Sequence, residues 1–292
     1  MRFLTAALSL TAVVPLTAAS QTADSLAVRF SGMTAVTGYE QAMADSLVAL
    51  LPGSGRDRVG NVTLTLGRGA PKRLVSCPLD EVGYVVGNVM DDGYLTLRRV
   101  GGGPRLGYPI FDQQLEGQRV TLFGRLGAVP GVVAVRSTHL TRGRPTGGGG
   151  DAPFTVDNAY VDVGAVSRAD VTALGLGILT PVSLTKRPHR YGDRGALLAA
   201  PVAGRRAACA ALAAAALSKP RVRGTVVIAF TVQSLYAVNA GLNSVKALQG
   251  PFDETRELTL TVRYPDTAVE TVALADAEAL MRSVVEWIGG GR

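Results

Sequence analysis

The sequence predicts an α/β protein into which a small all-β domain is inserted. Residues 224–233, GTVVIAFTVQ, form a continuous apolar run, which is typical of a strand buried on both faces of a parallel sheet. Helical segments precede and follow this run. Between residues 82 and 186 the pattern changes to short strands separated by glycine-rich turns, which is typical of a small barrel or sandwich.

The composition indicates a globular protein with a large core. The chain has 292 residues, of which 47% are hydrophobic and 18% are charged. Its formal net charge of +7 comes from scattered arginines, with no run of Lys and Arg. Because a nucleic-acid surface gathers its basic residues on one face or helix, we expect no nucleic-acid partner.

Residues 1–20 are predicted to be a secretory signal peptide. Arg2 supplies the positive start, an apolar run follows, and the small residues at 18–20 suit cleavage. The alternative, a short membrane anchor, is disfavoured by Pro15. No later stretch reaches the roughly 20 apolar residues that a spanning helix needs. We therefore expect no membrane span after cleavage, and a periplasmic or secreted protein.

Helices and strands alternate before the insertion. Residues 24–51 carry apolar residues at helical spacing, with a turn at Gly38 and an amphipathic helix over residues 41–51. Residues 59–66 alternate like a half-buried strand, and residues 73–77 read as the next strand.

The insertion is predicted to hold several short strands. Residues 82–100 form two strands around a turn at 91–93, and residues 118–135 form two more around a turn at 127–130. The glycine-rich residues 141–151 are predicted to be a surface loop, because their composition offers nothing to pack.

After this loop the insertion is predicted to continue to residue 186, and strands alternating with helices return from residue 196. A short strand is followed by an N-capped helix that begins near residues 167–170. A last barrel strand is predicted at residues 182–186 and an alanine-rich helix at residues 205–217. One further strand is predicted at residues 258–262 and a terminal amphipathic helix at residues 272–288.

The chemistry is predicted at the end of a strand within residues 74–86, LVSCPLDEVGYVV. Asp80 and Glu81 follow the apolar part of this strand directly. Ionised groups are seldom left beside a core without a partner or a metal ion, so these carboxylates mark a candidate site.

Several separated segments occur in an order and spacing that resemble the tetrahedral aminopeptidases. This family of co-catalytic metallopeptidases includes glutamyl and deblocking aminopeptidases and proteins labelled endoglucanase M. The segments are GMTAVTGYE, DRVGNVTLTL, LDEVGYVVGNVMDDGYLTLRRVGG, YVDVGAVSRADVTALGLGILTPVSL, FTVQ and RYPDTAVETVALADAEAL. The resemblance implies a phosphorylase-like or peptidase-like α/β sandwich domain, residues 21–81 and 187–292, interrupted by a small β-barrel domain, residues 82–186. In the family, that β domain helps to build dimers and larger shells.

The family's chemistry uses two divalent metal ions, held by His, Asp and Glu, with a separate Glu as general base. The resemblance implies that most of these donors are lost here. The first metal His falls on Pro78, and the Asp that supports it is kept as Asp80. The bridging Asp falls on or beside Gly204.

The remaining positions follow the central strand. The general base and the next metal ligand of the family fall on Ser234 and Leu235, which replace two glutamates. The last metal His falls on Asp266, the one replacement that could still bind a metal ion. A further ligand lies in a region that is shortened here to residues 241–258, where a lone Asp253 does not make a metal site.

These losses predict a pseudo-peptidase with no catalytic residues and no resident metal ion or cofactor. We expect it to act in binding or assembly: self-association, association with paralogous subunits, or capture of a peptide or protein ligand. The alternative is an active metal-dependent aminopeptidase or other hydrolase, with zinc or cobalt in a site rebuilt from Asp80, Glu81 and Asp266.

Cys77 and Cys209 are an even pair of cysteines in a protein expected to be exported. The resemblance places both beside former metal-ligand positions, Cys77 next to Pro78 and Cys209 on the helix after Gly204. A disulfide across the vacated site is therefore one expectation, and two buried free thiols are the other.

Two other chemistries use the same residues. Ser234 as a nucleophile would need an adjacent base, and no Gly-x-Ser-x-Gly elbow surrounds it. Asp80, Glu81 and Asp266 could form the acid pair of a glycosidase. Against this, Asp80 could simply cap or form a salt bridge within the old cleft. The two histidines, His139 and His189, are interpreted as ordinary surface or turn residues.

Overall fold

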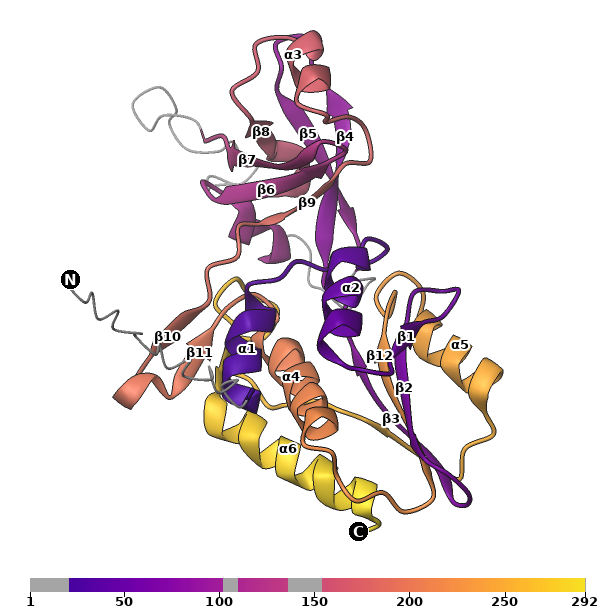
Figure 1. The fold of residues 1–292 in the computed structure, drawn as a ribbon. Helices are drawn as coiled ribbons and strands as arrows, with labels where there is room; N and C mark the ends of the chain where they lie inside the picture. Colours follow the sequence, from indigo (N-terminus) through magenta and orange to yellow (C-terminus); the bar gives the residue numbers. More distant parts are fainter. Residues whose placement is uncertain (1–20, 102–109, 136–153, 292) are drawn as a thin grey trace, which may run out of the picture.

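The computed structural model describes residues 21–101, 110–135 and 154–291, and it consists of an α/β part that carries a β-barrel (Figure 1). The predicted signal peptide, residues 1–20, and the predicted glycine-rich loop, residues 141–151, lie outside the described residues. The mixed α/β class and the barrel agree with the fold that the sequence predicts.

The α/β part is built on a five-stranded sheet in the order β1-β2-β12-β3-β13. β12 pairs with β3 in parallel and with β2 in antiparallel orientation, and β13 extends the parallel side. The residues of β12 from Val226 to Thr231 are all buried, as expected for a strand covered on both faces. The strands are β1 (Gly55–Arg56), β2 (Val62–Gly67), β3 (Lys72–Pro78), β12 (Thr225–Thr231) and β13 (Glu254–Glu257).

The strand predicted over residues 258–262 was misplaced, because β13 ends at Glu257. The Leu258 N–H still donates to the Ser76 carbonyl oxygen at 2.8 Å, and Leu258 is buried in the core. Leu260 and Val262 pack against the same core. Their alternation therefore reports burial of an extended segment, not pairing in the sheet.

Helices cover both faces of the sheet unequally (Figure 1). Val226, Ile228 and Phe230 of β12 face the large core, which contains residues of α1, α2, α4 and α6. Val227 and Ala229 face a smaller cluster with α5. The helices are α1 (Ala23–Ser31), α2 (Gln41–Leu50), α4 (Ala203–Leu217), α5 (Ala240–Gln249) and α6 (Leu274–Gly289).

A small antiparallel sheet, which the sequence pattern did not predict, stands beside these helices. It pairs β10 (His189–Tyr191), β11 (Leu197–Ala199) and β14 (Thr271–Ala273). Each strand has three residues, too few to display a period of two. α5 was missed as well, within a segment that the sequence indicated only as a short connection.

The barrel is closed in the order β4-β5-β8-β7-β6-β9, with antiparallel neighbours throughout. Its turn between β6 and β7 falls at residues 124–127, earlier than predicted, because Pro130 pairs with Thr121 inside β7. Its elements are β4 (Gly83–Val89), β5 (Leu95–Val100), η2 (Ile110–Leu115), β6 (Arg119–Gly124), β7 (Gly127–Val133), η3 (Val156–Asn158), β8 (Tyr160–Asp162), α3 (Arg168–Ala173) and β9 (Pro181–Leu184).

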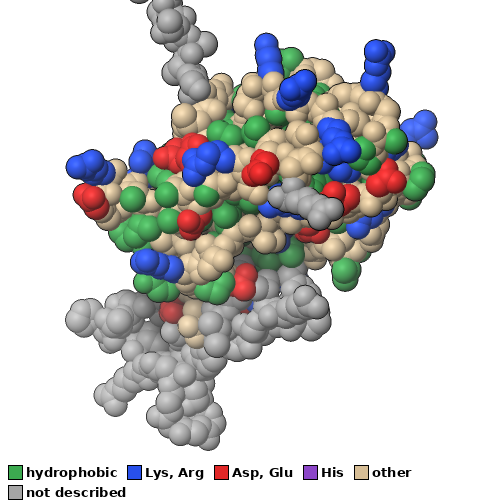
Figure 2. All heavy atoms as spheres, turned by 90° about the horizontal axis from the view of Figure 1, so that it is seen from below, with side chains coloured by type: hydrophobic (Ala, Val, Ile, Leu, Met, Phe, Trp, Pro, Cys, Tyr) green, Lys and Arg blue, Asp and Glu red, His purple; other side chains and the backbone are tan. Residues whose placement is uncertain are grey.

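Charged side chains of both signs are interspersed on the lower face of the molecule. In Figure 2, which shows the molecule from below, basic side chains are separated by acidic, polar and apolar ones. In the described part of the chain, none of the helices has both the length and the apolar character needed to cross a membrane.

Arg73 ties β3 to the end of α6. Its guanidinium donates to the Ile288 carbonyl at 2.9 Å, to the Arg223 carbonyl at 2.8 Å and to the Trp287 carbonyl, and it lies 4.6 Å from the centre of the Trp287 ring. The residue is only 4% exposed. It therefore adds charge-assisted hydrogen bonds to carbonyl groups at and beside the end of the helix.

We expect Arg73→Met to lower the free energy of unfolding by about 2–3 kcal/mol, because buried carbonyls lose charge-assisted hydrogen bonds while the side-chain volume is kept. Urea unfolding followed by circular dichroism measures this change. Arg68→Met, at an exposed position, is the matched control and should stay within about 0.5 kcal/mol of the wild type. Equal effects of the two substitutions would contradict the role given to Arg73.

Candidate functional site

The candidate site lies where β3 and β12 end and α4 begins. β3 ends at Pro78, and the chain then supplies Asp80 and Glu81. After β12 the chain supplies Ser234, and the first turn of α4 supplies Arg205. The carboxyl ends of parallel strands meet at one edge of a sheet, which is where α/β proteins commonly bind ligands.

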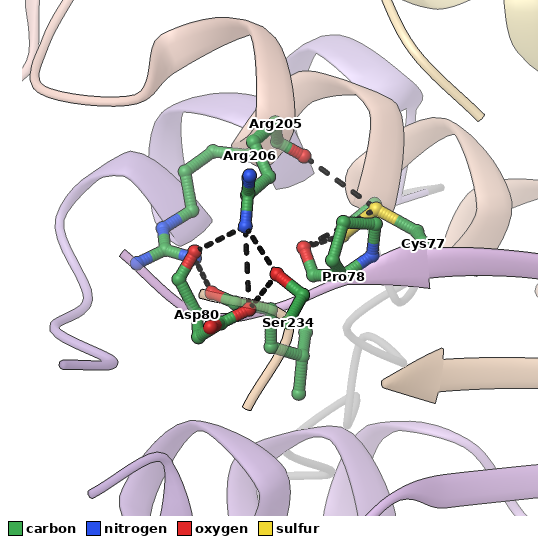
Figure 3. The surroundings of a disulfide bond; sticks show 8 residues. Cys77, Pro78, Asp80, Arg205, Arg206 and Ser234 are labelled. Carbon is green, nitrogen blue, oxygen red and sulfur yellow. Dashed lines mark hydrogen bonds and ion pairs between the residues drawn. A yellow bond between two sulfur atoms is a disulfide. The ribbon is translucent and has the colours of Figure 1, made fainter. Parts of the chain in front are cut away.

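Asp80 is fully buried and is held by the other segments (Figure 3). Its Oδ1 accepts from the Ser234 hydroxyl at 2.6 Å and from Arg205 Nη1 at 3.2 Å, and its Oδ2 accepts from the Leu235 N–H at 2.8 Å. Arg205 Nη1 also donates to the Asp80 carbonyl at 2.8 Å and to the Ser234 oxygen at 3.0 Å. A guanidinium therefore neutralises the carboxylate at the centre of the site.

Glu81 points to a second set of cations. Its carboxylate lies 2.6 Å from Lys186 Nζ and 3.1 Å from Arg206 Nη2, and it accepts from the Ala35 N–H at 3.1 Å. Burial alone would raise the pKa of Glu81, but Lys186 and Arg206 outweigh it and hold this pKa below its usual value. Glu81 is thus a buried, ionised structural partner.

Two further buried carboxyl groups hold the backbone around the site. Glu40 Oε1 accepts from the N–H groups of Gly38 at 3.0 Å and Gln233 at 2.8 Å. Glu270 accepts from the N–H groups of Gly204 at 2.8 Å and Asp266 at 3.3 Å. Burial raises the pKa of both glutamates.

Gly204 sits where no side chain fits. A Cβ atom built on it would lie 2.3 Å from Val262 Cγ1 and 3.3 Å from Glu270 Oε1. An aspartate at this position would therefore clash with Val262 and repel Glu270. The packing explains why this position carries a glycine.

Several non-glycine residues in the left-handed backbone region surround the site. Val202, Gln233, Tyr264 and Asp266 have φ values of 52°, 55°, 54° and 59°. For the β-branched Val202 this is a genuine outlier. Such strain persists only where the surroundings fix the backbone, and it gathers at functional sites.

A disulfide joins Cys77 at the end of β3 to Cys209 on α4, the pairing that the resemblance led us to expect. The two Cα atoms are 5.4 Å apart, and both residues are fully buried. Cys209 lies four residues after Arg205, about one helical turn, so the cross-link fixes this turn against the strand that leads to Asp80.

The structure brings most of the predicted positions together. Pro78, Asp80, Gly204, Ser234 and Leu235 all lie at this junction of β3, β12 and α4. Within residues 21–101, 110–135 and 154–291, however, no group of three His, Cys, Asp or Glu side chains could hold a metal ion.

The donor set therefore does not fit a dinuclear metal centre. Pro78, Gly204 and Leu235 have no side-chain donor atom, and both oxygens of Asp80 are already hydrogen-bonded. Arg205 places a positive charge in contact with the carboxylate of Asp80, which disfavours a divalent cation there.

Sequence reasoning missed the three cations of the site, Arg205, Arg206 and Lys186. The two arginines follow Gly204 directly and were visible in the sequence. The requirement that Asp80 and Glu81 find positive partners was the signal that pointed to them.

A cavity adjoins this site, between the barrel and the α/β part. Its volume is about 240 Å³, and its walls include Val82, Leu184, Val202, Arg205, Leu235 and Asp266. Lys186 and Glu81 also border it. The ion pairs described above thus stand beside a space that a small molecule or one peptide side chain can enter.

Comparison with known proteins identifies the family. Residues 60–236 match the family described as M42 glutamyl aminopeptidase. The chain belongs to this family. The lysyl aminopeptidase of Pyrococcus furiosus is 32% identical over 150 residues, which make up 50% of this chain and 40% of that enzyme. The chain thus spans about 40% of the length of the curated M42 relatives that it matches.

Solved structures agree on the M42 fold. An aminopeptidase of the archaeon Desulfurococcus kamchatkensis superposes with a TM-score of 0.72 at 15% identity, over 91% of this chain and 94% of that one. The Pyrococcus horikoshii TET1 peptidase, which can assemble into a tetrahedron or a large octahedral shell, gives 0.68 at 18% identity over 89% and 97% of the two chains. The predicted family and fold class are confirmed.

Removal of the disulfide tests its contribution to stability. We expect Cys77→Ala/Cys209→Ala to lower the free energy of unfolding by about 3–5 kcal/mol, because the bond closes a long loop in the unfolded chain. The residues that it joins are 132 positions apart. Urea unfolding of the variant, of the wild type and of the reduced wild type measures the difference.

Alkylation provides the control for this experiment. Intact mass should stay unchanged when the unfolded, unreduced wild type is alkylated. Two added alkyl groups would show that the cysteines are free.

Glu81→Gln tests the buried ion cluster. We expect a loss of about 3–5 kcal/mol near pH 7, because Lys186 and Arg206 would stay buried without their shared counter-charge. The folded-state pKa of Glu81 lies below 4.5, so its stabilising contribution is present above pH 4.5 and is lost as the pH falls through the folded pKa. The difference between wild type and variant should therefore shrink on acidification.

Urea unfolding at a series of pH values checks both parts of this prediction. Glu257→Gln, at an exposed position, is the matched control and should have little effect at any pH. A difference for Glu81→Gln that stays constant as the pH falls would contradict the assignment.

Proposed function

We propose that this protein is a non-catalytic member of the M42 family that binds a ligand or partner in its retained cleft. The observation that carries the proposal is the Asp80–Arg205–Ser234 network, which uses the remaining carboxylate for a protein ion pair. Metal-assisted hydrolysis needs open coordination positions and a water-activating base, and these residues supply neither.

The other chemistries weighed from the sequence receive no support from the geometry. The Ser234 hydroxyl donates to Asp80 and accepts from Arg205, so it lies between an acid and a cation, with no histidine among its contacts. Glu81 is ionised between two cations and is a poor general acid for glycoside cleavage. Asp80 has the role of a salt-bridged residue within the old cleft.

We further propose that the protein is exported and self-associates. The signal-like residues 1–20 and the buried disulfide support export, because disulfides persist in oxidising compartments. The assembly of the Pyrococcus horikoshii TET1 peptidase into shells supports self-association of a chain with the same fold. A subunit that joins paralogous chains is a variant of this proposal, and pull-down from the native source separates it from a solitary binder.

Metal content tests the proposal. Protein purified without chelator or affinity metal should contain close to zero zinc, cobalt or other divalent metal per chain by mass spectrometry. Calorimetric titration with Zn²⁺ or Co²⁺ should give no tight, stoichiometric binding, because the donor atoms are absent or already bonded.

Activity provides the second readout. Aminoacyl-nitroanilides should not be hydrolysed, with or without added metal. A metal content near two per chain, or hydrolysis that a chelator abolishes, would overturn the proposal and favour an active site rebuilt around Asp80, Glu81 and Asp266.

A further inference from the structure

We propose that the cavity beside Arg205 binds an organic carboxylate with a short apolar body, and that Arg205 holds the carboxylate. The inference rests on the proposed function and names the ligand class of that same cleft. The cavity has a volume of about 240 Å³. The residues that line it combine the apolar Val82, Leu184, Val202 and Leu235 with Arg205.

The guanidinium of Arg205 uses only one of its nitrogens inside the site. Nη1 makes the contacts to Asp80 and Ser234. Among the described residues, Nε and Nη2 have no hydrogen-bond partner, and the side chain is 26% exposed. Nε and Nη2 form a planar fork of two parallel donors, which matches the two oxygens of a carboxylate.

The charge of the ion cluster favours an anion. The ion pairs of this cluster join Arg205, Arg206 and Lys186 to Asp80 and Glu81, so three cations share two carboxylates. Arg206 is 0% exposed and Lys186 only 6%, so water screens the excess charge poorly.

The nearby carboxyl groups do not cancel this excess. Glu40 and Glu270 make no ion pair within the described residues, and each already accepts hydrogen bonds from two backbone N–H groups. Asp266 is exposed at the rim of the cavity, where water screens it. A ligand carboxylate in the cavity would balance the cluster.

The size of the cavity limits the body of the ligand. Its volume is about 240 Å³. A branched or short acyl group of similar size fits such a space. This chemistry occurs in a free acylated amino acid and in the C-terminal residue of a peptide.

Calorimetry with matched probes tests the proposal and distinguishes the two sources. The probes are N-acetylleucine, its carboxamide, a peptide that ends in leucine and the same peptide amidated. We expect both free carboxylates to bind and both amides to bind at least about tenfold more weakly, because the amides carry no charge for the fork. Tighter binding of the peptide than of N-acetylleucine assigns the site to chain termini, and equal binding assigns it to the small acid.

Two substitutions with opposite expected signs locate the site. Arg205→Lys should weaken carboxylate binding about tenfold, because an ammonium keeps the charge but lacks the fork. Asp266→Asn should strengthen binding several-fold, because it removes a like charge at the rim and asparagine tolerates the left-handed backbone. Arg187→Lys, at an exposed arginine that is not among the residues lining this cavity, is the control and should change nothing.

The outcomes separate this inference from the proposed function. Equal binding of acids and amides, or no binding of any probe at millimolar concentration by metal-free protein, overturns the carboxylate site alone. Two metal ions per chain in the same samples overturn the proposed function. Loss of the near-ultraviolet circular dichroism signal of Arg205→Lys would show that this variant is not natively packed. In that case, unchanged affinity of Asp266→Asn for the carboxylate probes still refutes the site.

Discussion

The buried ion pair between Asp80 and Arg205 joins parts of the chain that are far apart in sequence. Asp80 follows β3, Arg205 opens α4, and Ser234, which contacts both, follows β12. A buried carboxylate needs a positive charge beside it. Here a side chain supplies it, so the same carboxylate serves to hold the strand ends and the helix together.

The neighbouring features restrict this arrangement further. The Cys77–Cys209 disulfide fixes the end of β3 against α4 on one side of the ion pair. On the other side, Gly204 packs so closely on Val262 that only hydrogen fits in place of a side chain. Both features hold Arg205 in one position. The guanidinium is therefore preorganised, which lowers the entropic cost of any contact that it makes toward the cavity.

The burial pattern of the sequence predicted the fold, and the residue types at the resembling positions predicted that the donors of a dinuclear metal centre are missing. Residues 224–233 predicted the central strand because both of its faces are buried. Pro78, Gly204 and Leu235 indicate that metal-binding donors are missing, because their side chains have no donor atom. The apolar pattern misplaced β13. The alternation at Leu258 and Leu260 reflects packing on the core, whereas pairing in the sheet depends on the neighbouring strand. It also missed Arg205, since only tertiary contacts distinguish a site arginine from a solvated one.

The buried charges and the strained backbone of the site cost folding free energy, so stability alone does not explain their presence. Five charged side chains lie in or beside the core. Well-packed apolar residues of similar volume often stabilise a protein at least as much as a buried ion cluster does. Val202 and Asp266, in the left-handed backbone region, border the cavity that adjoins this cluster. If nothing constrained this site, we would expect both the buried charges and the strained backbone to be lost. Their presence together around one cavity supports the proposal that this cleft binds a ligand.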